Sequence, residues 1–191
     1  MKGIILAGGL GSRLYPLTYA TNKHLLPVYN KPMIYYPIKT LVDAGIDEIL
    51  IVVGGPHAGD FINVLQNGKE FGIKHLEYAF QDNEGGIPAA LALAEDFSDG
   101  QSVAVILGDN TTDAKIKPVI KEFQSGAHLF LKKVPDPERY GIPIFGDDGK
   151  TIIGTVEKPK NAKNSNAITG LYLFDSEVFD IIRTLKPSDR G

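Results

Sequence analysis

Short runs of apolar residues alternate along the chain with stretches in which apolar residues recur every three or four positions. The short runs are typical of β-strands, and the spaced pattern is typical of amphipathic helices. Strands are predicted at residues 3–7, 48–53, 75–80, 102–107, 127–134 and 167–174. Helices are predicted at about 34–42, 61–71, 86–96 and 117–124. This alternation predicts an α/β fold in which helices flank a mixed, mostly parallel sheet.

The pattern changes after residue 134. Two β-rich runs, 140–145 and 151–156, flank the turn sequence Gly146-Asp147-Asp148-Gly149, which predicts a hairpin. A last helix is predicted to begin at 175–177, with one face formed by Val178, Ile181, Ile182 and Leu185. Because there is no repeat, low-complexity tract or linker, we expect residues 1–191 to form a single domain.

Composition narrows the class of protein. With 191 residues, 43% hydrophobic and 23% charged, and a net charge of −3, the chain resembles an ordinary globular protein. We therefore expect no nucleic-acid partner and no membrane partner. The chain has no cysteine, which excludes disulfides and a cysteine nucleophile and favours the cytoplasm. Residues 1–9 are interpreted as a core strand and not as a signal peptide.

A glycine-rich segment follows the first strand, where an α/β sheet places its ligand crevice. It reads Leu6-Ala7-Gly8-Gly9-Leu10-Gly11-Ser12-Arg13-Leu14. Glycines let backbone N–H groups approach a phosphate, and Arg13 adds a fork of cationic donors. A dinucleotide fingerprint would need glycine at Leu14, so an oxidoreductase is disfavoured, and a Walker loop would need lysine after its last glycine. Taken alone, the segment also fits a turn that needs glycine only for steric reasons.

The residues that follow extend this segment into a long motif, Asn22-Lys23-His24-Leu25-Leu26-Pro27-Val28 and then Lys31-Pro32-Met33. The combined pattern resembles the sugar-1-phosphate nucleotidylyltransferase family, and within it the glucose-1-phosphate thymidylyltransferase subgroup. Further matching segments follow in order: Gln81 with Gly85-Gly86, Leu107-Gly108-Asp109-Asn110, Asp136–Gly141, Glu157-Lys158-Pro159 and Thr169-Gly170-Leu171-Tyr172. The resemblance covers the whole chain.

The resemblance implies a Rossmann-like nucleotide-diphospho-sugar transferase fold, whose hairpin forms a small sugar-side lobe. It implies transfer of a nucleotide from dTTP or UTP to glucose 1-phosphate, with release of pyrophosphate and with Mg²⁺ as cofactor at Asp109. The implied catalytic cations are Arg13, Lys23 and Lys158. The implied nucleotide-binding residues are Leu6, Gly8, Gly9, Gly11, Ser12, Arg13, Gln81, Gly86 and Asp109. The implied sugar-phosphate-binding residues are Gly141, Glu157, Lys158, Thr169 and Gly170.

Several of these residues have a plainer interpretation. Lys23 also fits a solvated surface lysine, Asp109 a turn residue, and Gln81 an exposed polar loop. Glu157 and Lys158 fit a solvated turn, in which Pro159 favours an extended backbone for Lys158. The four histidines show no metal-ligand spacing and are interpreted as structural or surface residues. The Tyr35-Tyr36 pair is expected to belong to the core.

Two features depart from the family pattern. Thr111-Thr112-Asp113 stands where the family has apolar and aromatic residues. The chain stops at 186–191, where the family continues to a segment with another metal-binding aspartate. Two functions therefore stay open: an active transferase, and a nucleotide-sugar-binding or regulatory module with weakened catalysis. A homo-oligomer is expected by resemblance only, and the sequence does not separate dTTP from UTP.

Overall fold

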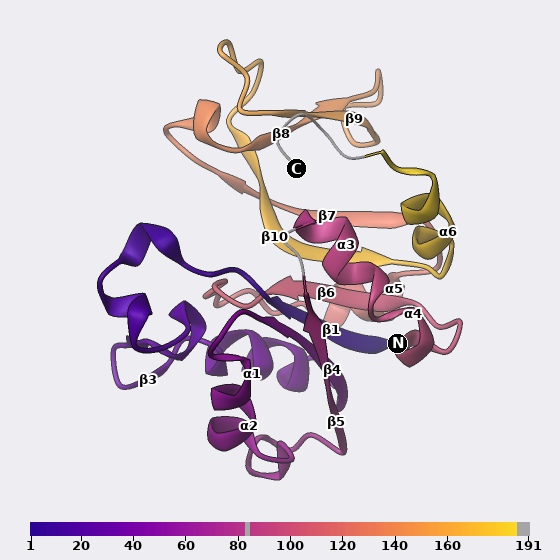
Figure 1. Ribbon diagram of the computed structural model, residues 1–191. Helices are drawn as coiled ribbons and strands as arrows, with labels where there is room; N and C mark the ends of the chain where they lie inside the picture. The colour runs from indigo at the N-terminus through magenta and orange to yellow at the C-terminus, as the bar shows by residue number, and fades with distance from the viewer. Residues whose placement is uncertain (83–84, 187–191) are drawn as a thin grey trace.

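The computed structural model describes residues 1–82 and 85–186, and a six-stranded sheet lies at its centre (Figure 1). Its strands, in spatial order, are β5 (His75–Gln81), β4 (Glu48–Gly54), β1 (Lys2–Ala7), β6 (Val103–Leu107), β10 (Asn166–Phe174) and β7 (Ala127–Lys133). The first four run parallel to one another, whereas β10 is antiparallel to both of its neighbours. The predicted mixed, mostly parallel sheet is therefore confirmed.

Helices cover both faces of this sheet. Strand β1 is buried on both sides: Ile5 and Ala7 pack into one core, and Ile4 and Leu6 pack into the other. The first core is closed by α1 (Tyr35–Asp43), α2 (Ala58–Leu65) and α5 (Lys117–Glu122). The second core is closed by α3 (Gly86–Ala92), α4 (Glu95–Ser98) and α6 (Glu177–Thr184). Because side chains alternate along a strand, a continuous apolar run serves both layers.

Two small antiparallel sheets complete the fold. The predicted hairpin is present as β8 (Gly141–Phe145) and β9 (Ile152–Glu157), and it forms a lobe beside β10 and β7 (Figure 1). The second small sheet pairs β2 (Pro27–Val28) with β3 (Lys31–Pro32). Five 3-10 turns lie between the larger elements: η1 (Ser12–Leu14), η2 (Leu17–Tyr19), η3 (Lys23–Leu25), η4 (Lys69–Phe71) and η5 (Pro137–Arg139).

Three helix predictions differ from the structure. The helix predicted over 61–71 ends at Leu65, because Gln66 and Gly68 take positive φ angles of 49° and 73°. The helix predicted over 86–96 is divided into α3 and α4. In the last helix, Val178 and Ile182 pack against the core as predicted, but Ile181 and Leu185 are 56% and 52% exposed and Phe179 is buried, so the predicted apolar face was wrong in part. Here the contact with α3 and the sheet, which no local pattern shows, decides which side is buried.

Some predictions fall outside the described residues. These include the departure at the chain end, except for Lys186, and residues 83–84 between Gln81 and Gly85. Within the described part of the chain, no helix has both the length and the apolar character needed to cross a membrane.

Candidate functional site

A cavity of about 260 Å³ lies at the carboxyl edge of the parallel strands. The turn after β1 and the ends of β5 and β6 bring distant motifs together there. The lining residues predicted from the sequence are Leu6, Gly8, Gly9, Lys23, Gln81, Gly86 and Asp109. The lining residues that were not predicted are His24, Ile87, Ala90 and Leu107. Three motifs far apart in the sequence therefore share one cavity, at the edge of the sheet where α/β proteins bind ligands.

The charged centre of this cavity is a pair formed by Lys23 and Asp109. Lys23 Nζ donates a hydrogen bond of 2.7 Å to Asp109 Oδ2, and the two side chains are 25% and 39% exposed. Burial works against the charge of Asp109. The hydrogen bond and charge of Lys23 outweigh that effect and hold the pKa of Asp109 below its ordinary value. Asp109 is therefore an anion at neutral pH, and the surface-lysine interpretation of Lys23 is wrong.

The base of the cavity is set by a close approach of Gln81 to the glycine loop. A Cβ atom placed on Gly8 would lie 2.4 Å from Gln81 Oε1, so a larger residue would displace the end of this side chain. Gly54, at the end of β4, packs closely on the other side, and its Cβ would lie 2.9 Å from the carbonyl oxygen of Gly8. The amide of Gln81 lies against the loop, where it can hydrogen-bond a planar polar ligand.

The loop that carries Gly11, Ser12 and Arg13 folds back over Lys23. Gly11 has a φ of 67°, and its carbonyl oxygen accepts a 2.9 Å hydrogen bond from Thr18 Oγ1. Arg13 lies in η1, is exposed and does not line the cavity. The structure thus brings Gly11 against Lys23 but leaves Ser12 and Arg13 exposed and outside the lining of the cavity.

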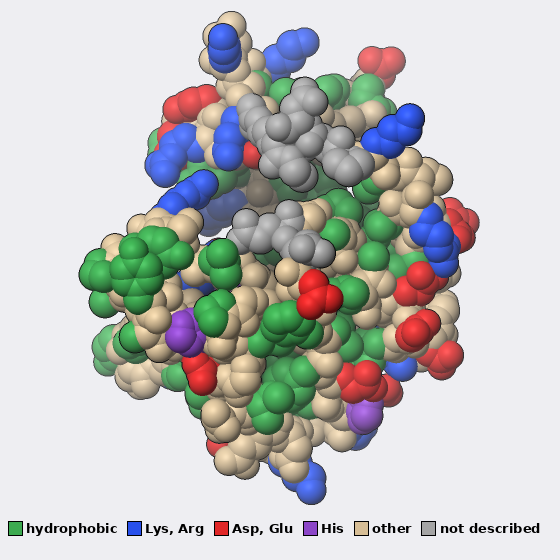
Figure 2. Space-filling view, viewed as in Figure 1, with side chains coloured by type: hydrophobic (Ala, Val, Ile, Leu, Met, Phe, Trp, Pro, Cys, Tyr) green, Lys and Arg blue, Asp and Glu red, His purple; other side chains and the backbone are tan. Residues whose placement is uncertain are grey.

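Apolar side chains are exposed in the same N-terminal segment as Ser12 and Arg13. Figure 2 shows hydrophobic side chains gathered on the flank where Figure 1 places the N-terminal loops. The exposed apolar residues of that segment are Leu10, Leu14, Tyr15, Leu17, Tyr19 and Tyr29. The rings of Tyr15 and Tyr19 stack with centroids 4.2 Å apart, which stiffens the chain that follows Arg13.

A second cavity, of about 300 Å³, lies between β10 and the hairpin lobe. It is lined by Leu129, Gly141, Thr155, Glu157, Ile168, Tyr172 and Phe174. Of the predicted sugar-side residues, Gly141 and Glu157 therefore meet, and a Cβ on Gly141 would lie 3.1 Å from Glu157 Oε2. Burial, and then Glu157, raise the pKa of Tyr172, which keeps this phenol protonated at neutral pH. This cavity offers both a carboxylate and a hydroxyl to a polyhydroxylated ligand.

Lys158 departs from its predicted backbone. Its φ is 46°, although Pro159 favours an extended conformation, so the predicted extended backbone was wrong. The chain turns sharply where β9 ends, after the amide of Lys158 donates a 3.0 Å hydrogen bond to the carbonyl oxygen of Tyr140. Lys158 Nζ lies 3.5 Å from Glu157 Oε1, with both side chains at least half exposed.

The remaining predicted sugar-side residues lie at an irregularity of β10. Thr169 Oγ1 donates a 2.9 Å hydrogen bond to the carbonyl oxygen of Phe130, and Thr169 lines a neighbouring cavity of about 670 Å³ instead of the one with Glu157. Gly170 packs on the end of β6, where its Cβ would lie 2.6 Å from Leu107 and 2.8 Å from Asn110 Nδ2. Gly170 thus belongs as much to the Asp109 loop as to the sugar side.

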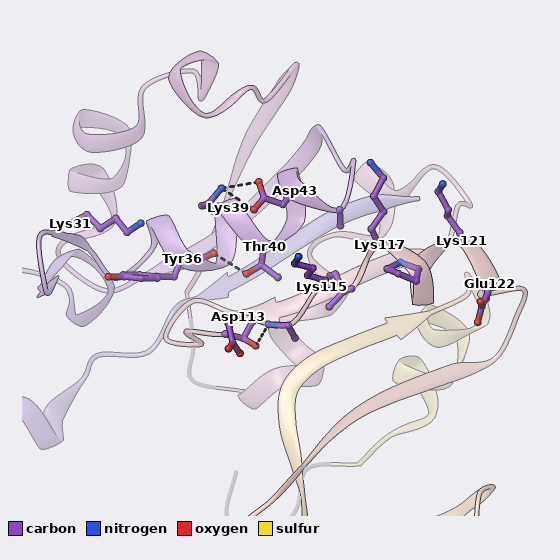
Figure 3. A pocket seen from close by; sticks show the side chains of 15 residues that line it. Lys31, Tyr36, Lys39, Thr40, Asp43, Asp113, Lys115, Lys117, Lys121 and Glu122 are labelled. Carbon is purple, nitrogen blue, oxygen red and sulfur yellow. Dashed lines mark hydrogen bonds and ion pairs between the residues drawn. The ribbon is translucent and has the colours of Figure 1, made fainter.

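A larger cavity, of about 880 Å³, contains none of the predicted site residues. It lies between α1 and the segment 112–122, and five lysines surround it: Lys31, Lys39, Lys115, Lys117 and Lys121 (Figure 3). Asp113, from the segment that departs from the family pattern, lines this cavity. The candidate site is therefore the smaller cavity, where seven predicted residues meet, and not the larger one.

Comparison with known proteins agrees with this geometry. A family model described as nucleotidyl transferase matches residues 2–191. The chain belongs to the nucleotidyl transferase family. A glucose-1-phosphate thymidylyltransferase from Actinoplanes sp. is 42% identical over 100% of this chain and 63% of its own length. One from Mycolicibacterium smegmatis is 42% identical and is covered over 67% of its length. The chain thus spans about two thirds of the length of these relatives.

Solved structures support the same family. A Bacillus anthracis protein described as a glucose-1-phosphate thymidylyltransferase, crystallised with sucrose, is 49% identical. It superposes with a TM-score of 0.92 over 100% of this chain and 78% of that one. A UDP-glucose pyrophosphorylase in complex with UDP-glucose shares the fold with a TM-score of 0.83, at 24% identity. Family and fold therefore match those implied by the sequence motifs.

One carboxylate, that of Asp109, is among the described residues that line this cavity. No cluster of three or more His, Asp or Glu side chains that could hold a metal is found in the described parts of the chain. Asp109 supplies a single ionised carboxylate in a cavity open to water. One carboxylate, with phosphate oxygens and waters as the other ligands, fits the way that Mg²⁺ is held beside nucleotides.

His24 lines the site, although sequence reasoning did not place it there. Of the two interpretations, structural or surface residue, the structure supports the first: His24 is 2% exposed and lines the cavity beside Lys23. Burial and the charge of Lys23, against a smaller opposing effect of Asp109, lower the pKa of His24 to about 4. The ring is therefore neutral at pH 7. Its position next to Lys23 in the motif was the only signal in the sequence.

Proposed function

We propose that this protein is a nucleotidyltransferase that joins dTTP or UTP to glucose 1-phosphate and releases pyrophosphate. The observation that carries the proposal is the Lys23–Asp109 pair inside a glycine-lined cavity that also holds Gln81. The names of the relatives support the same reaction, and the chain matches about two thirds of their length.

In this reaction a phosphate oxygen of the sugar phosphate attacks the α-phosphorus of the triphosphate. The new P–O bond forms as the bond to the leaving pyrophosphate breaks, and negative charge spreads over the transferred group. Catalysis of this kind depends on positioning and on cations, with no need for a covalent nucleophile. Lys23 would neutralise the α-phosphate, and Arg13 would bind the outer phosphates.

The other roles follow from the same geometry. Gln81 would hydrogen-bond the edge of the base, and Gly8 would let the backbone approach the phosphates. Glu157 would accept hydrogen bonds from sugar hydroxyls, and Lys158 would pair with the sugar phosphate. Asp109 would hold Mg²⁺, which when bound neutralises phosphate charge and orients the leaving pyrophosphate.

The proposal extends to the setting of the protein. We place it in the cytoplasm, because nucleoside triphosphates are available there and the chain has no cysteine to oxidise. We propose that residues 1–191 act as one domain within a homo-oligomer. Size-exclusion chromatography with light scattering tests the oligomer.

The decisive experiment measures pyrophosphate release by the 191-residue chain with Mg²⁺, glucose 1-phosphate and either dTTP or UTP. Release that needs both substrates and stops with a chelator supports the transferase and ranks the two bases. Binding of dTTP without release supports the alternative, a nucleotide-sugar-binding or regulatory module.

Variants test the residues. Asp109→Asn and Arg13→Ala should each lower the rate on the order of 10²-fold. Asp47→Asn is the matched control, because Asp47 pairs with Lys74 elsewhere on the surface. Near-normal turnover in both site variants would show that the site is assigned wrongly.

A further inference from the structure

His24 occupies the turn that carries Lys23. The turn η3 begins after Asn22, whose side-chain oxygen accepts a 3.0 Å hydrogen bond from the backbone amide of His24. The carbonyl oxygen of His24 in turn accepts a 2.8 Å hydrogen bond from the amide of Ile34. Asn22 and His24 are both buried, at 4% and 2% exposure. The backbone on either side of Lys23 is therefore fixed by buried polar groups, while the Lys23 side chain remains free to reach the cavity.

The hydrogen bonds determine the tautomer of the His24 ring. A backbone N–H can only donate, so the Asn22 atom that it contacts is the oxygen Oδ1 and not the amide nitrogen. His24 Nδ1 lies 2.7 Å from the same oxygen. Because Oδ1 can only accept, Nδ1 carries the proton and Nε2 does not. The neutral imidazole is thus held in one orientation by Asn22.

The other edge of the ring packs on the glycine that precedes Asp109. A Cβ on Gly108 would lie 2.8 Å from His24 Cδ2, 3.2 Å from His24 Nε2 and 3.1 Å from Ala7 Cβ. The amide of Gly108 donates a 2.8 Å hydrogen bond to the carbonyl oxygen of Leu6, which fixes this glycine to the end of β1. The ring therefore fills the space between the turn of Lys23 and the loop of Asp109.

We infer that His24 is a positioning residue that holds the turn of Lys23 at a fixed distance from the loop of Asp109. Asn22 orients the ring, Gly108 receives it, and the 2.7 Å contact between Lys23 and Asp109 results from this spacing. The spacing role of His24 does not depend on the proposed function. Only the use of the Lys23–Asp109 pair in catalysis rests on that function. A displacement of 1 Å in such a pair is enough to lower a rate strongly.

The test measures the accessibility of the Lys23 amine, which requires no catalytic activity. The 191-residue chain is acetylated briefly with an N-hydroxysuccinimide ester, and labelling of each lysine is followed by peptide mass spectrometry. In the parent chain the Lys23 amine should react slowly, because Asp109 holds it, whereas the exposed Lys133 of β7 serves as the internal reference. His24→Leu fills the space without a donor and should raise labelling of Lys23 about fivefold, the effect of losing one hydrogen bond.

Two variants separate positioning from simple packing. His24→Asn restores a donor at the place of Nδ1 and should bring labelling of Lys23 back to within about twofold of the parent. Asn22→Ser keeps a helix-capping oxygen, but the serine side chain is too short to reach the ring. Labelling of Lys23 in Asn22→Ser should therefore rise as it does in His24→Leu, and this second variant provides the test if His24→Leu folds poorly. His128→Leu, at an exposed histidine of β7, is the matched control.

The outcomes are distinct. Faster labelling confined to Lys23 in His24→Leu and Asn22→Ser, with rescue by His24→Asn, supports the positioning role. Unchanged labelling of Lys23 overturns it. A uniform rise at all lysines in every His24 variant also overturns it, because the ring would then only fill the core. Absence of pyrophosphate release would count against the proposed function and leave the labelling result unaffected.

Discussion

Acid should destabilise this fold through His24 before the carboxylates are protonated. The ordinary pKa of histidine is 6.5, and burial followed by the charge of Lys23 lowers the pKa of His24 to about 4. The unfolded chain therefore takes up the proton first as the pH falls. The free energy of unfolding should decrease from about pH 6.5 down to about pH 4, and this contribution should then level off. At neutral pH the ring is uncharged in both states, so no penalty exists there.

The size of the effect follows from the two pKa values. The interval from 6.5 to about 4 corresponds to about 3 kcal/mol, since each pH unit is equivalent to about 1.4 kcal/mol. A typical domain has a stability of about 5–15 kcal/mol, so the loss should be easy to measure. The pKa of Asp109 is lowered below 3.8, against the opposing effect of burial and through the hydrogen bond of Lys23, so its contribution is lost only at still lower pH.

Urea unfolding at pH 7.0, 6.0, 5.0 and 4.5, followed by circular dichroism, tests this prediction. Circular dichroism suits the chain because it has no tryptophan. His24→Asn is the reference, since asparagine keeps a donor towards Asn22 but does not titrate. The difference in unfolding free energy between the two proteins should shift by about 2 kcal/mol between pH 7.0 and 5.0. Parallel curves over this range would refute the reasoning, because they would show that the buried ring does not resist protonation.

Other predictions concern the nucleotide side of the site. Gly8→Ala should weaken dTTP binding about tenfold in a calorimetric titration, since its Cβ would displace the flexible end of Gln81, while unfolding is little affected. Gly59→Ala, in α2, is the matched control, because its Cβ would meet no described atom within 4 Å, and equal loss in both variants would contradict the steric argument. Gly54→Ala should instead lower the unfolding free energy by about 1–3 kcal/mol in urea, because its Cβ meets backbone atoms that cannot move aside. Titration with Mn²⁺ should show weaker binding of the metal–dTTP complex by Asp109→Asn, and unchanged binding would remove Asp109 from the metal site.

The strands were predictable because their signal is local. Runs such as Val103–Leu107 are apolar at every position, as expected for strands buried on both faces of a sheet, and all six strands of the central sheet lie within one or two residues of their predicted ranges. The helices were less predictable at their ends. Gln66 takes a positive φ that its residue type does not favour, and the hydrogen bond from Tyr78 to its carbonyl oxygen comes from a strand 12 residues later.

For the cavity that contains Lys23 and Asp109, the sequence predicted most of the lining residues but not the contacts between them. The sequence places Asp109 directly after a strand, and topology then requires it to lie at the carboxyl edge of the sheet. Nothing local indicates that Lys23, 86 residues earlier, reaches the same carboxylate. The buried state of His24 was equally hidden, because Gly108, against which its ring packs, is far from it in the sequence.

The antiparallel strand β10 brings Gly170, one of the predicted sugar-side residues, against the loop that carries Asp109. β10 pairs with β6 from Leu171 onwards, so the residue just before this pairing lies beside the end of β6. That residue is Gly170, at the point where the register of β10 against β7 shifts, and its close contacts are Leu107 and Asn110 on either side of the Asp109 loop. A Cβ at position 170 would force the side chain of Leu107 or Asn110 to shift. Strand β10, which borders the hairpin lobe, is therefore in close contact through Gly170 with both ends of the loop that carries Asp109.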